Sequence, residues 1–215
     1  MKIAGIDEAG RGPIIGPLVM AVVVIDEKDE PTLKRWGVKD SKLLTPSQRE
    51  ELFEKISKKF KHEIIIITPK EIDQALADPK NNLNWLEAQT SAKLLSKIKA
   101  NKAYLDCPST NINTYTDYVK SLVGKINIVA EHGADATYPV VSAASIIAKV
   151  TRDREIENLK AKFGDLGSGY PSDPATQEFL KRNYNNKEMI EIFRTSWETY
   201  KKIVAEKHQK KLDSF

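Results

Sequence analysis

Residues 2–26 read KIAGIDEAGRGPIIGPLVMAVVVID, and this stretch decides the fold. Lys2–Asp7 and Pro17–Asp26 are short apolar segments, and the second is rich in β-branched residues, so we predict two strands. The connecting segment Glu8–Gly16 is too short to contain a crossover helix. We therefore expect these two strands to pair in antiparallel fashion.

Further apolar runs and helical patterns alternate along the rest of the chain. Three more strands are predicted, at His62–Thr68, Lys102–Asp106 and Ile126–Glu131. Helices separate these strands, which allows the strands to run parallel. We expect an α/β fold in which a mixed five-stranded sheet has helices on both faces.

The helical segments are marked by their caps and by turn residues. Pro46–Phe60 is predicted as a helix with Thr45 as N-cap, and Gln48 completes a capping box. Leu83–Ala100 is predicted as an amphipathic helix. From Pro139 onward the pattern is almost wholly helical, with a break at Gly164–Pro174 where glycines and prolines gather.

Composition limits the class of protein. The 215-residue chain is 40% hydrophobic with a net charge of +4, which excludes a disordered chain and a uniformly polybasic one. The single cysteine, Cys107, excludes an intrachain disulfide and is typical of a cytoplasmic setting. The longest apolar run, Ile14–Ile25, is too short to cross a bilayer. We expect a cytoplasmic protein without membrane contact, with one domain over residues 1–200 and a tail at 201–215.

Four carboxylates follow predicted strands. Asp7 and Glu8 end the first strand, Asp106 ends the fourth, and Asp135 follows the fifth. Acids at strand ends are commonly just solvated, but four together would repel one another unless cations lay between them. Oxygen ligands without a histidine or thiol cluster favour Mg²⁺ or Mn²⁺ over zinc. Because Asp7 and Glu8 would face opposite sides of a strand, we expect them to share a site only if the chain turns at Glu8.

The segment Ala9–Pro13 contains the Gly10-Arg11-Gly12 turn that such a change of direction requires. Glycine also lets a backbone approach a ligand closely. The segment is not a dinucleotide fingerprint, because Ile15 stands where a third glycine is needed, and no Gly-Lys-Ser/Thr sequence follows as in a P-loop.

The string GIDEAGRGP at Gly5–Pro13 closely resembles the opening motif of the type 2 ribonucleases H, or ribonuclease HII. Other blocks agree in order: Lys39–Lys42, Leu105-Asp106, Asp135 with Tyr138–Asp153, and GSGYPSDP at Gly167–Pro174, which looks archaeal. The resemblance extends from Met1 to about Tyr200. It implies a ribonuclease H-like fold with a helical C-terminal region.

The resemblance also implies an activity and its residues. Members of the family hydrolyse the RNA strand of RNA/DNA hybrids and cut DNA that carries a single ribonucleotide, leaving 3′-hydroxyl and 5′-phosphate ends. The catalytic and metal-binding carboxylates would be Asp7, Glu8, Asp106 and Asp135, with two Mg²⁺ or Mn²⁺ ions. The elements that read the ribonucleotide would be Gly10, Arg11, Gly12 and Tyr170. We expect a monomer that acts in DNA replication and repair.

Further substrate contacts are predicted from spacing and from the resemblance. Ser142, Ser145 and Lys149 share one helix face and could bind backbone phosphates, although small-residue packing is the simpler explanation. Asp40, Ser41 and Lys42 form a polar loop before a helix; capping alone would explain them, and only the resemblance makes them substrate contacts. Arg11 is expected either to hold a phosphate or to pair with an acid.

Other conspicuous residues have simpler interpretations. We expect Trp197, one turn from Arg194 in a helical segment, to be a core aromatic residue, and Cys107 to be buried. His132 near Asp135 is expected to be structural. The C-terminal Gln209, Leu212 and Phe215 resemble the sliding-clamp-binding box Q-x-x-L-x-x-aromatic, and a frayed terminal helix is the alternative.

Two other functions are compatible with the same fold. A catalytically silent duplex-binding adaptor would gain nothing from four acids placed against phosphates. A DNA nuclease or resolvase would not need a reader of the 2′-hydroxyl such as Gly10–Gly12 with Tyr170. A metal-dependent endoribonuclease is the hypothesis that uses all of these residues.

Overall fold

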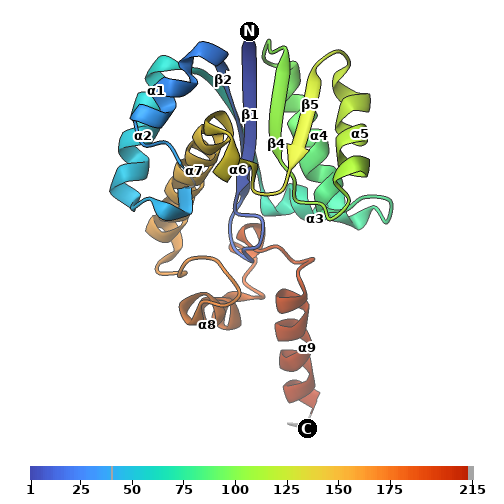
Figure 1. Cartoon of the computed structure of the whole chain (residues 1–215). Helices are drawn as coiled ribbons and strands as arrows, with labels where there is room; N and C mark the ends of the chain where they lie inside the picture. The colour runs from blue at the N-terminus through green and yellow to red at the C-terminus, as the bar shows by residue number, and fades with distance from the viewer. Residues whose placement is uncertain (40, 213–215) are drawn as a thin grey trace. The chain divides into compact units, whose positions relative to one another are not determined.

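The computed structural model of the chain describes residues 1–39 and 41–212, with His208 and residues 210–212 described by their backbone alone. It contains a five-stranded mixed sheet in the order β3-β2-β1-β4-β5 (Figure 1). The α/β prediction is thus confirmed. The strands are β1 (Lys2–Ala9), β2 (Leu18–Asp26), β3 (Lys61–Ile67), β4 (Lys102–Asp106) and β5 (Asn127–Glu131).

The central strand β1 fixes the register of the sheet. It pairs antiparallel with β2 from Lys2↔Asp26 to Ala9↔Val19, as the short connection predicts. It pairs parallel with β4 only as far as Ile6↔Leu105, and β4 pairs parallel with β5. The last three residues of β1 therefore extend beyond its pairing with β4.

Helices cover both faces of the sheet (Figure 1). On one face lie α1 (Glu30–Arg35), α2 (Pro46–Lys59) and the long α7 (Pro139–Phe163), which form one hydrophobic core with β1 and β2. The other face carries α4 (Leu83–Ser96) and α5 (Ile112–Val123). Helix α7 passes so close to β1 that a Cβ atom on Gly5 would lie 2.3 Å from the carbonyl carbon of Val140. Glycine is needed there for space.

Local capping explains where several helices begin. The Thr45 hydroxyl accepts from the Gln48 amide at 3.3 Å and Gln48 Oε1 accepts from the Thr45 amide at 2.9 Å, which confirms the predicted capping box of α2. The same arrangement of Thr68 and Glu71 starts α3 (Pro69–Ala77), a helix that the sequence prediction omits. Helix α4 ends at Ser96, four residues earlier than predicted, because the next amides turn back to carbonyls three residues away.

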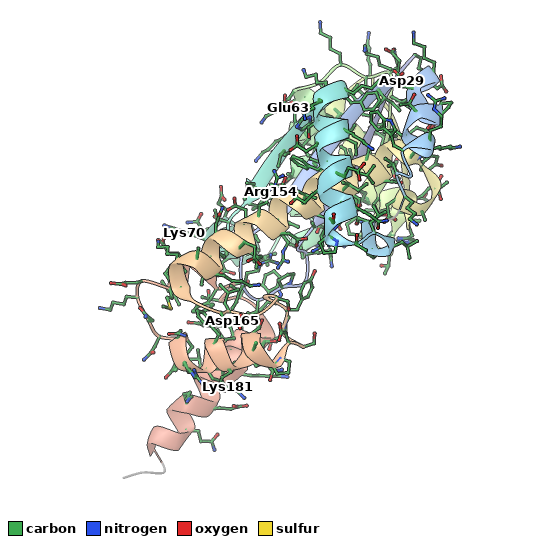
Figure 2. The ribbon with its side chains drawn as sticks, turned by 90° about the vertical axis from the view of Figure 1, so that its left-hand side faces the viewer. Asp29, Glu63, Lys70, Arg154, Asp165 and Lys181 are labelled. Carbon is green, nitrogen blue, oxygen red and sulfur yellow. The ribbon has the colours of Figure 1, made fainter. Side chains whose placement is uncertain are left out.

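The chain divides into two compact units. The first comprises Met1–Ala9, Val19–Ile66 and Leu83–Arg152, and it contains the sheet. The second comprises Gly10–Leu18, Ile67–Asn82 and the chain from Asp153 onward. Its own core includes Ile14, Ile15, Phe179 and Phe193. Exposed charged side chains such as Lys70 and Lys181 project outward from it (Figure 2).

The helical C-terminal region is less continuous than predicted. It holds the end of α7, then α8 (Pro174–Asn183), the 3-10 turn η3 (Ile190–Ile192) and α9 (Glu198–Leu212). The break between α7 and α8 agrees with the predicted one. Residues 193–197 are not helical, so the prediction that Arg194 and Trp197 lie in a helix is wrong. Within the described residues, no helix has both the length and the hydrophobicity that a membrane crossing requires.

Candidate active site

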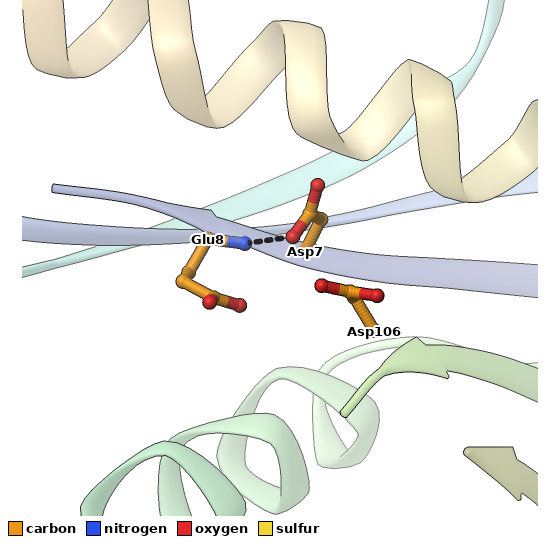
Figure 3. Close-up of side chains that lie close together, drawn as sticks. All are labelled: Asp7, Glu8 and Asp106. Atoms are coloured by element: carbon orange, nitrogen blue, oxygen red, sulfur yellow. Dashed lines mark hydrogen bonds between the residues drawn. The ribbon is translucent and has the colours of Figure 1, made fainter. Parts of the chain in front are cut away.

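Three carboxylates gather where β1 extends beyond β4. Asp7 and Glu8 come from β1 and Asp106 is the last residue of β4, and each offers an oxygen atom within 4.8 Å of the others (Figure 3). The expected turn at Glu8 is wrong, because β1 continues through Ala9. Asp7 and Glu8 leave the strand on different sides, yet both reach the space beside the end of β1 that extends past its pairing with β4 (Figure 3).

Asp7 is buried and strongly perturbed. Its Oδ1 atom accepts a hydrogen bond of 2.7 Å from the Glu8 amide. Burial raises the pKa of Asp7 from 3.8 to about 7, and the charges of Asp106 and Asp135 act in the same direction. Hydrogen bonds from Ser145 and the Glu8 amide oppose this rise in pKa. At neutral pH the Asp7 carboxylate therefore needs a proton or a cation beside it.

Asp135 lies close enough for its charge to act on Asp7, but it does not belong to the group of carboxylates whose oxygen atoms lie within 4.8 Å of one another. It is buried in the short helix α6 (Ala134–Thr137), and its Oδ2 atom is 3.8 Å from the exposed Lys42 ammonium group. Asp106 links the two elements, since its Oδ1 atom accepts from the Ala134 amide at 2.9 Å. The structure thus fixes the end of β4 to the helix that carries Asp135.

Several of the residues predicted to contact phosphates lie beside these acids. Ser145 and Ser41 are buried and their hydroxyl oxygens lie 2.9 Å apart, while the Ser142 hydroxyl donates to the Asp135 carbonyl at 2.5 Å. These hydroxyl groups thus have protein partners. Lys149 is half-buried farther along α7, and Asp40 lies outside the described residues. Ser145 is closest to the chemistry, because it bonds to Asp7.

The donor set fits a divalent metal ion. Asp7, Glu8 and Asp106 supply only carboxylate oxygens, at a separation that one ion could bridge. A cation would also relieve the cost of burying Asp7 as a carboxylate. These three residues could hold the metal, and Asp135 is a further acid whose charge acts on Asp7.

The second unit brings the glycine motif and Tyr170 together. Gly10 has φ = +85°, a conformation that favours glycine, and the exposed Gly12 is so close to Tyr170 that a Cβ atom would lie 3.7 Å from its ring. The amides of Ile14 and Ile15 donate to the Gly169 carbonyl at 2.8 and 3.2 Å. Two motifs far apart in sequence are therefore neighbours, and the half-buried Arg11 lies between the two glycines.

The loop that carries Tyr170 is held by Asp173. The Asp173 Oδ2 atom accepts from the Ser168 amide at 2.6 Å, and this bond, more than any other cause, lowers the pKa of Asp173 to about 2. Gly167 adopts φ = +70°, and a Cβ atom there would lie 2.7 Å from Asp173 Oδ2. The Asp173 carboxylate also caps α8.

Cys107, His132 and Trp197, for which the sequence predicts structural roles, have such roles, and Arg194 is a further structural residue. Cys107 is buried as predicted, and His132 Nδ1 lies 2.8 Å from the Cys107 carbonyl. Trp197 packs against the second core, but its indole group also donates to the Gly12 carbonyl. Arg194, which the sequence reasoning left without a role, is completely buried and donates to carbonyls of the glycine motif. A tertiary contact of this kind has no periodic signal in the sequence.

The comparisons with known proteins decide the family. The model of the ribonuclease HII family matches residues 4–200. The chain belongs to the ribonuclease HII family. A ribonuclease HII from Pyrococcus horikoshii is 49% identical over 222 residues, which span all of this chain and 99% of that protein. One from Methanococcus maripaludis is 46% identical over 217 residues, or 98% of this chain and 90% of that protein.

Solved structures agree. The crystal structure of the Pyrococcus horikoshii ribonuclease H2 has a TM-score of 0.87 at 48% identity, over 94% of this chain and 97% of that one. The ribonuclease HII in a complex with PCNA from Archaeoglobus fulgidus has a TM-score of 0.85 at 43% identity, over 92% and 96%. As a member of this family, the chain is a metal-dependent endonuclease with ribonuclease H activity on RNA/DNA hybrids.

Proposed function

We propose that this ribonuclease HII also cuts DNA duplexes at a single embedded ribonucleotide, on its 5′ side, and leaves a 3′-hydroxyl and a 5′-phosphate. Such a reaction suits ribonucleotide excision and primer removal. The observation that carries the proposal is the carboxylate cluster of Asp7, Glu8 and Asp106 in a chain that continues, two residues after Glu8, into the Gly10-Arg11-Gly12 motif.

We assign the metal to the four acids. Asp7, Glu8, Asp106 and Asp135 would hold two Mg²⁺ or Mn²⁺ ions, an assignment supported by the oxygen-only donor set. Bound ions of this kind polarise the scissile phosphate and make water a nucleophile near neutral pH. Ser145 would orient Asp7 through its hydroxyl group, and Ser41 would orient Ser145 in turn.

Lys42 would change partners when substrate binds. Its exposed ammonium group lies 3.8 Å from the buried Asp135 carboxylate. A long, exposed lysine can turn from a carboxylate to a backbone phosphate at small cost. Lys149, Ser142 and the polar loop around Ser41 remain candidate phosphate contacts on the same unit.

The glycine motif and Tyr170 would read the ribonucleotide. Backbone groups of Gly10–Gly12 can approach a 2′-hydroxyl closely because there are no Cβ atoms at either glycine. Tyr170, exposed beside Gly12, would stack on the adjoining deoxyribose, where a second 2′-hydroxyl fits poorly. A DNA nuclease would not need the glycine motif and Tyr170 to read a 2′-hydroxyl. A duplex-binding adaptor would not need the carboxylate cluster.

A cleavage assay tests the proposal. The substrates are an end-labelled DNA duplex with one ribonucleotide and a uniform RNA/DNA hybrid, each incubated with Mg²⁺, with Mn²⁺ or with chelator, and an all-DNA duplex of the same sequence is the control. We expect one metal-dependent cut on the 5′ side of the ribonucleotide and an intact control. Cutting of the control would make the protein a DNA nuclease. Cutting of hybrids alone would restrict it to the activity on continuous RNA strands.

We further propose that the C-terminal tail binds a sliding clamp. Gln209 is exposed near the end of α9, Leu212 is the last residue of that helix, and Phe215 lies outside the described residues. The pattern matches a short helical motif that docks in an apolar groove, and the Archaeoglobus fulgidus relative was solved with PCNA. Removal of residues 209–215 should abolish clamp binding in calorimetry while hybrid cleavage continues. Equal clamp binding by the shortened chain would refute this assignment.

A further inference from the structure

The Gly10–Gly12 motif is held from behind by a completely buried arginine. The Arg194 guanidinium donates to the carbonyls of Gly10 at 2.5 Å, of Arg11 at 2.8 Å and of Gly16 at 3.0 and 3.1 Å. Burying a guanidinium is costly unless its donors are satisfied. Its planar fork is suited to fixing several carbonyls at once. Arg194 therefore sets the orientation of successive peptide groups in one loop.

Trp197 continues this contact to the last residue of the motif. Its indole N–H donates to the Gly12 carbonyl at 3.3 Å, and its ring lies over the Arg194 guanidinium at 4.9 Å. The main chains also pair, since the Arg194 amide donates to the Ile14 carbonyl at 2.9 Å and the Gly16 amide to that of Ile192 at 2.9 Å. Residues 194–197, which we call the anchor segment, thus hold the loop by backbone and side chains.

Asp73 on α3 holds the anchor segment itself. Its Oδ2 atom accepts from the Thr195 amide and hydroxyl, both at 2.7 Å. Its Oδ1 atom accepts from the Ser196 amide at 3.1 Å and hydroxyl at 2.5 Å. One carboxylate therefore fixes the turn between Arg194 and Trp197. Hydrogen bonds to a charged acceptor are among the stronger ones in proteins.

The consequence for the motif follows from peptide geometry. In a trans peptide the carbonyl and the following N–H point in opposite directions. Because the carbonyls of Gly10 and Arg11 point at Arg194, the N–H groups of Arg11 and Gly12 point away from it. The Gly12 carbonyl, which accepts from Trp197, is followed by Pro13, and proline has no N–H group. The contacts of the anchor segment thus direct the two adjacent N–H groups of Arg11 and Gly12 away from Arg194.

We propose that Arg194, Trp197 and Asp73 are positioning residues that aim the Arg11 and Gly12 amides at the ribonucleotide, and so determine how strictly the enzyme selects its cutting site. This inference rests on the proposed role of the motif as the ribonucleotide reader. Asp73 acts only through the anchor segment. In a uniform hybrid every position of one strand is a ribonucleotide, whereas a singly substituted duplex has only one. A loosened loop should therefore slow cleavage of the singly substituted duplex more than cleavage of the hybrid.

Two conservative variants test the positioning role. Trp197→Phe removes the donor to Gly12 and keeps an aromatic ring over Arg194. Asp73→Asn keeps the shape but weakens the bonds to the turn without touching the loop. The matched control is Glu198→Gln, next to the anchor segment in sequence, which removes an exposed carboxylate that pairs with Lys201. Each is compared with the wild type in kcat/KM on a singly substituted duplex and on a uniform hybrid.

We expect both variants to lower kcat/KM on the single-ribonucleotide duplex by about tenfold relative to the hybrid, the effect of one lost hydrogen bond. Hydrogen exchange of residues 10–18 should become faster in both, with residues 19–26 unchanged. The control should keep the wild-type ratio. If the wild type cuts at single ribonucleotides but both variants keep the wild-type ratio of kcat/KM on the two substrates, the positioning role is overturned. A wild type that ignores single ribonucleotides would instead overturn the proposed function, and this inference with it.

Discussion

The buried Asp7 carboxylate should cost the metal-free enzyme stability, and Asp7→Asn should recover it. Burial raises the pKa of Asp7 from 3.8 to about 7 in the folded chain. The unfolded chain releases this proton near pH 4 and the folded chain only near pH 7. The free energy of unfolding therefore falls as pH rises through this window and levels off above it. A difference of about three pKa units corresponds to about 4 kcal/mol at pH 8.

Urea unfolding in chelator measures this effect directly. The asparagine side chain keeps an acceptor for the Glu8 amide but carries no charge, so Asp7→Asn should be more stable than the wild type by about 2–4 kcal/mol at pH 8. At pH 4 and below the advantage should vanish, because Asp7 is then protonated in the folded wild type. Excess Mg²⁺ should stabilise the wild type and not the variant. If the free energy of unfolding of Asp7→Asn exceeds that of the wild type by no more at pH 8 than at pH 4, the reasoning is refuted.

Three further predictions concern other parts of the chain. Tyr170→Ala should lower kcat/KM on a single-ribonucleotide duplex about tenfold more than on a uniform hybrid, because stacking on one sugar is lost; equal losses would exclude Tyr170 as a junction reader. Gly5→Ala should destabilise the protein by about 1–3 kcal/mol, since the new methyl group would lie 2.3 Å from the Val140 carbonyl, and an unchanged melting temperature would contradict that packing. Asp173 has a folded pKa of about 2, so its stabilising effect is present above pH 4 and lost as pH falls toward 2. In Asp173→Asn, the urea midpoint of unfolding should therefore fall less between pH 5 and pH 2 than in the wild type. Equal falls in the two proteins would count against the Ser168 bond.

Much of the fold is predictable because its signals are local. The β-branched run at Leu18–Asp26 and the short link before it require an antiparallel pair, and the Thr45–Gln48 capping box marks the start of α2. The family motif also points to the carboxylates. What local rules misjudge is how Asp7 and Glu8 meet: alternation along β1 places them on different sides, but β4 ends first and leaves room at the edge.

The anchor segment is not predictable in the same way. Arginine is almost never buried unless it is paired, so residue type alone does not predict the buried position of Arg194. Its partners in the glycine motif are carbonyls 183 and 184 residues away in sequence, and no pattern in the sequence encodes such a contact. Buried serines present the same difficulty: Ser145 has the spacing of a phosphate contact, but its hydroxyl is used by Ser41 and Asp7.

The most direct test of the central claim is single-turnover cleavage of a DNA duplex with one ribonucleotide by the wild type, Asp7→Asn and Asp135→Asn, in Mg²⁺ and in Mn²⁺. Asp29→Asn, a change at a distant acid that pairs with Lys59, serves as the control. We predict that the wild type and the control cut once on the 5′ side of the ribonucleotide. The two active-site variants should be folded by circular dichroism and inactive with either metal. Wild-type rates in either of them would contradict the assignment of these carboxylates to the metal-dependent reaction.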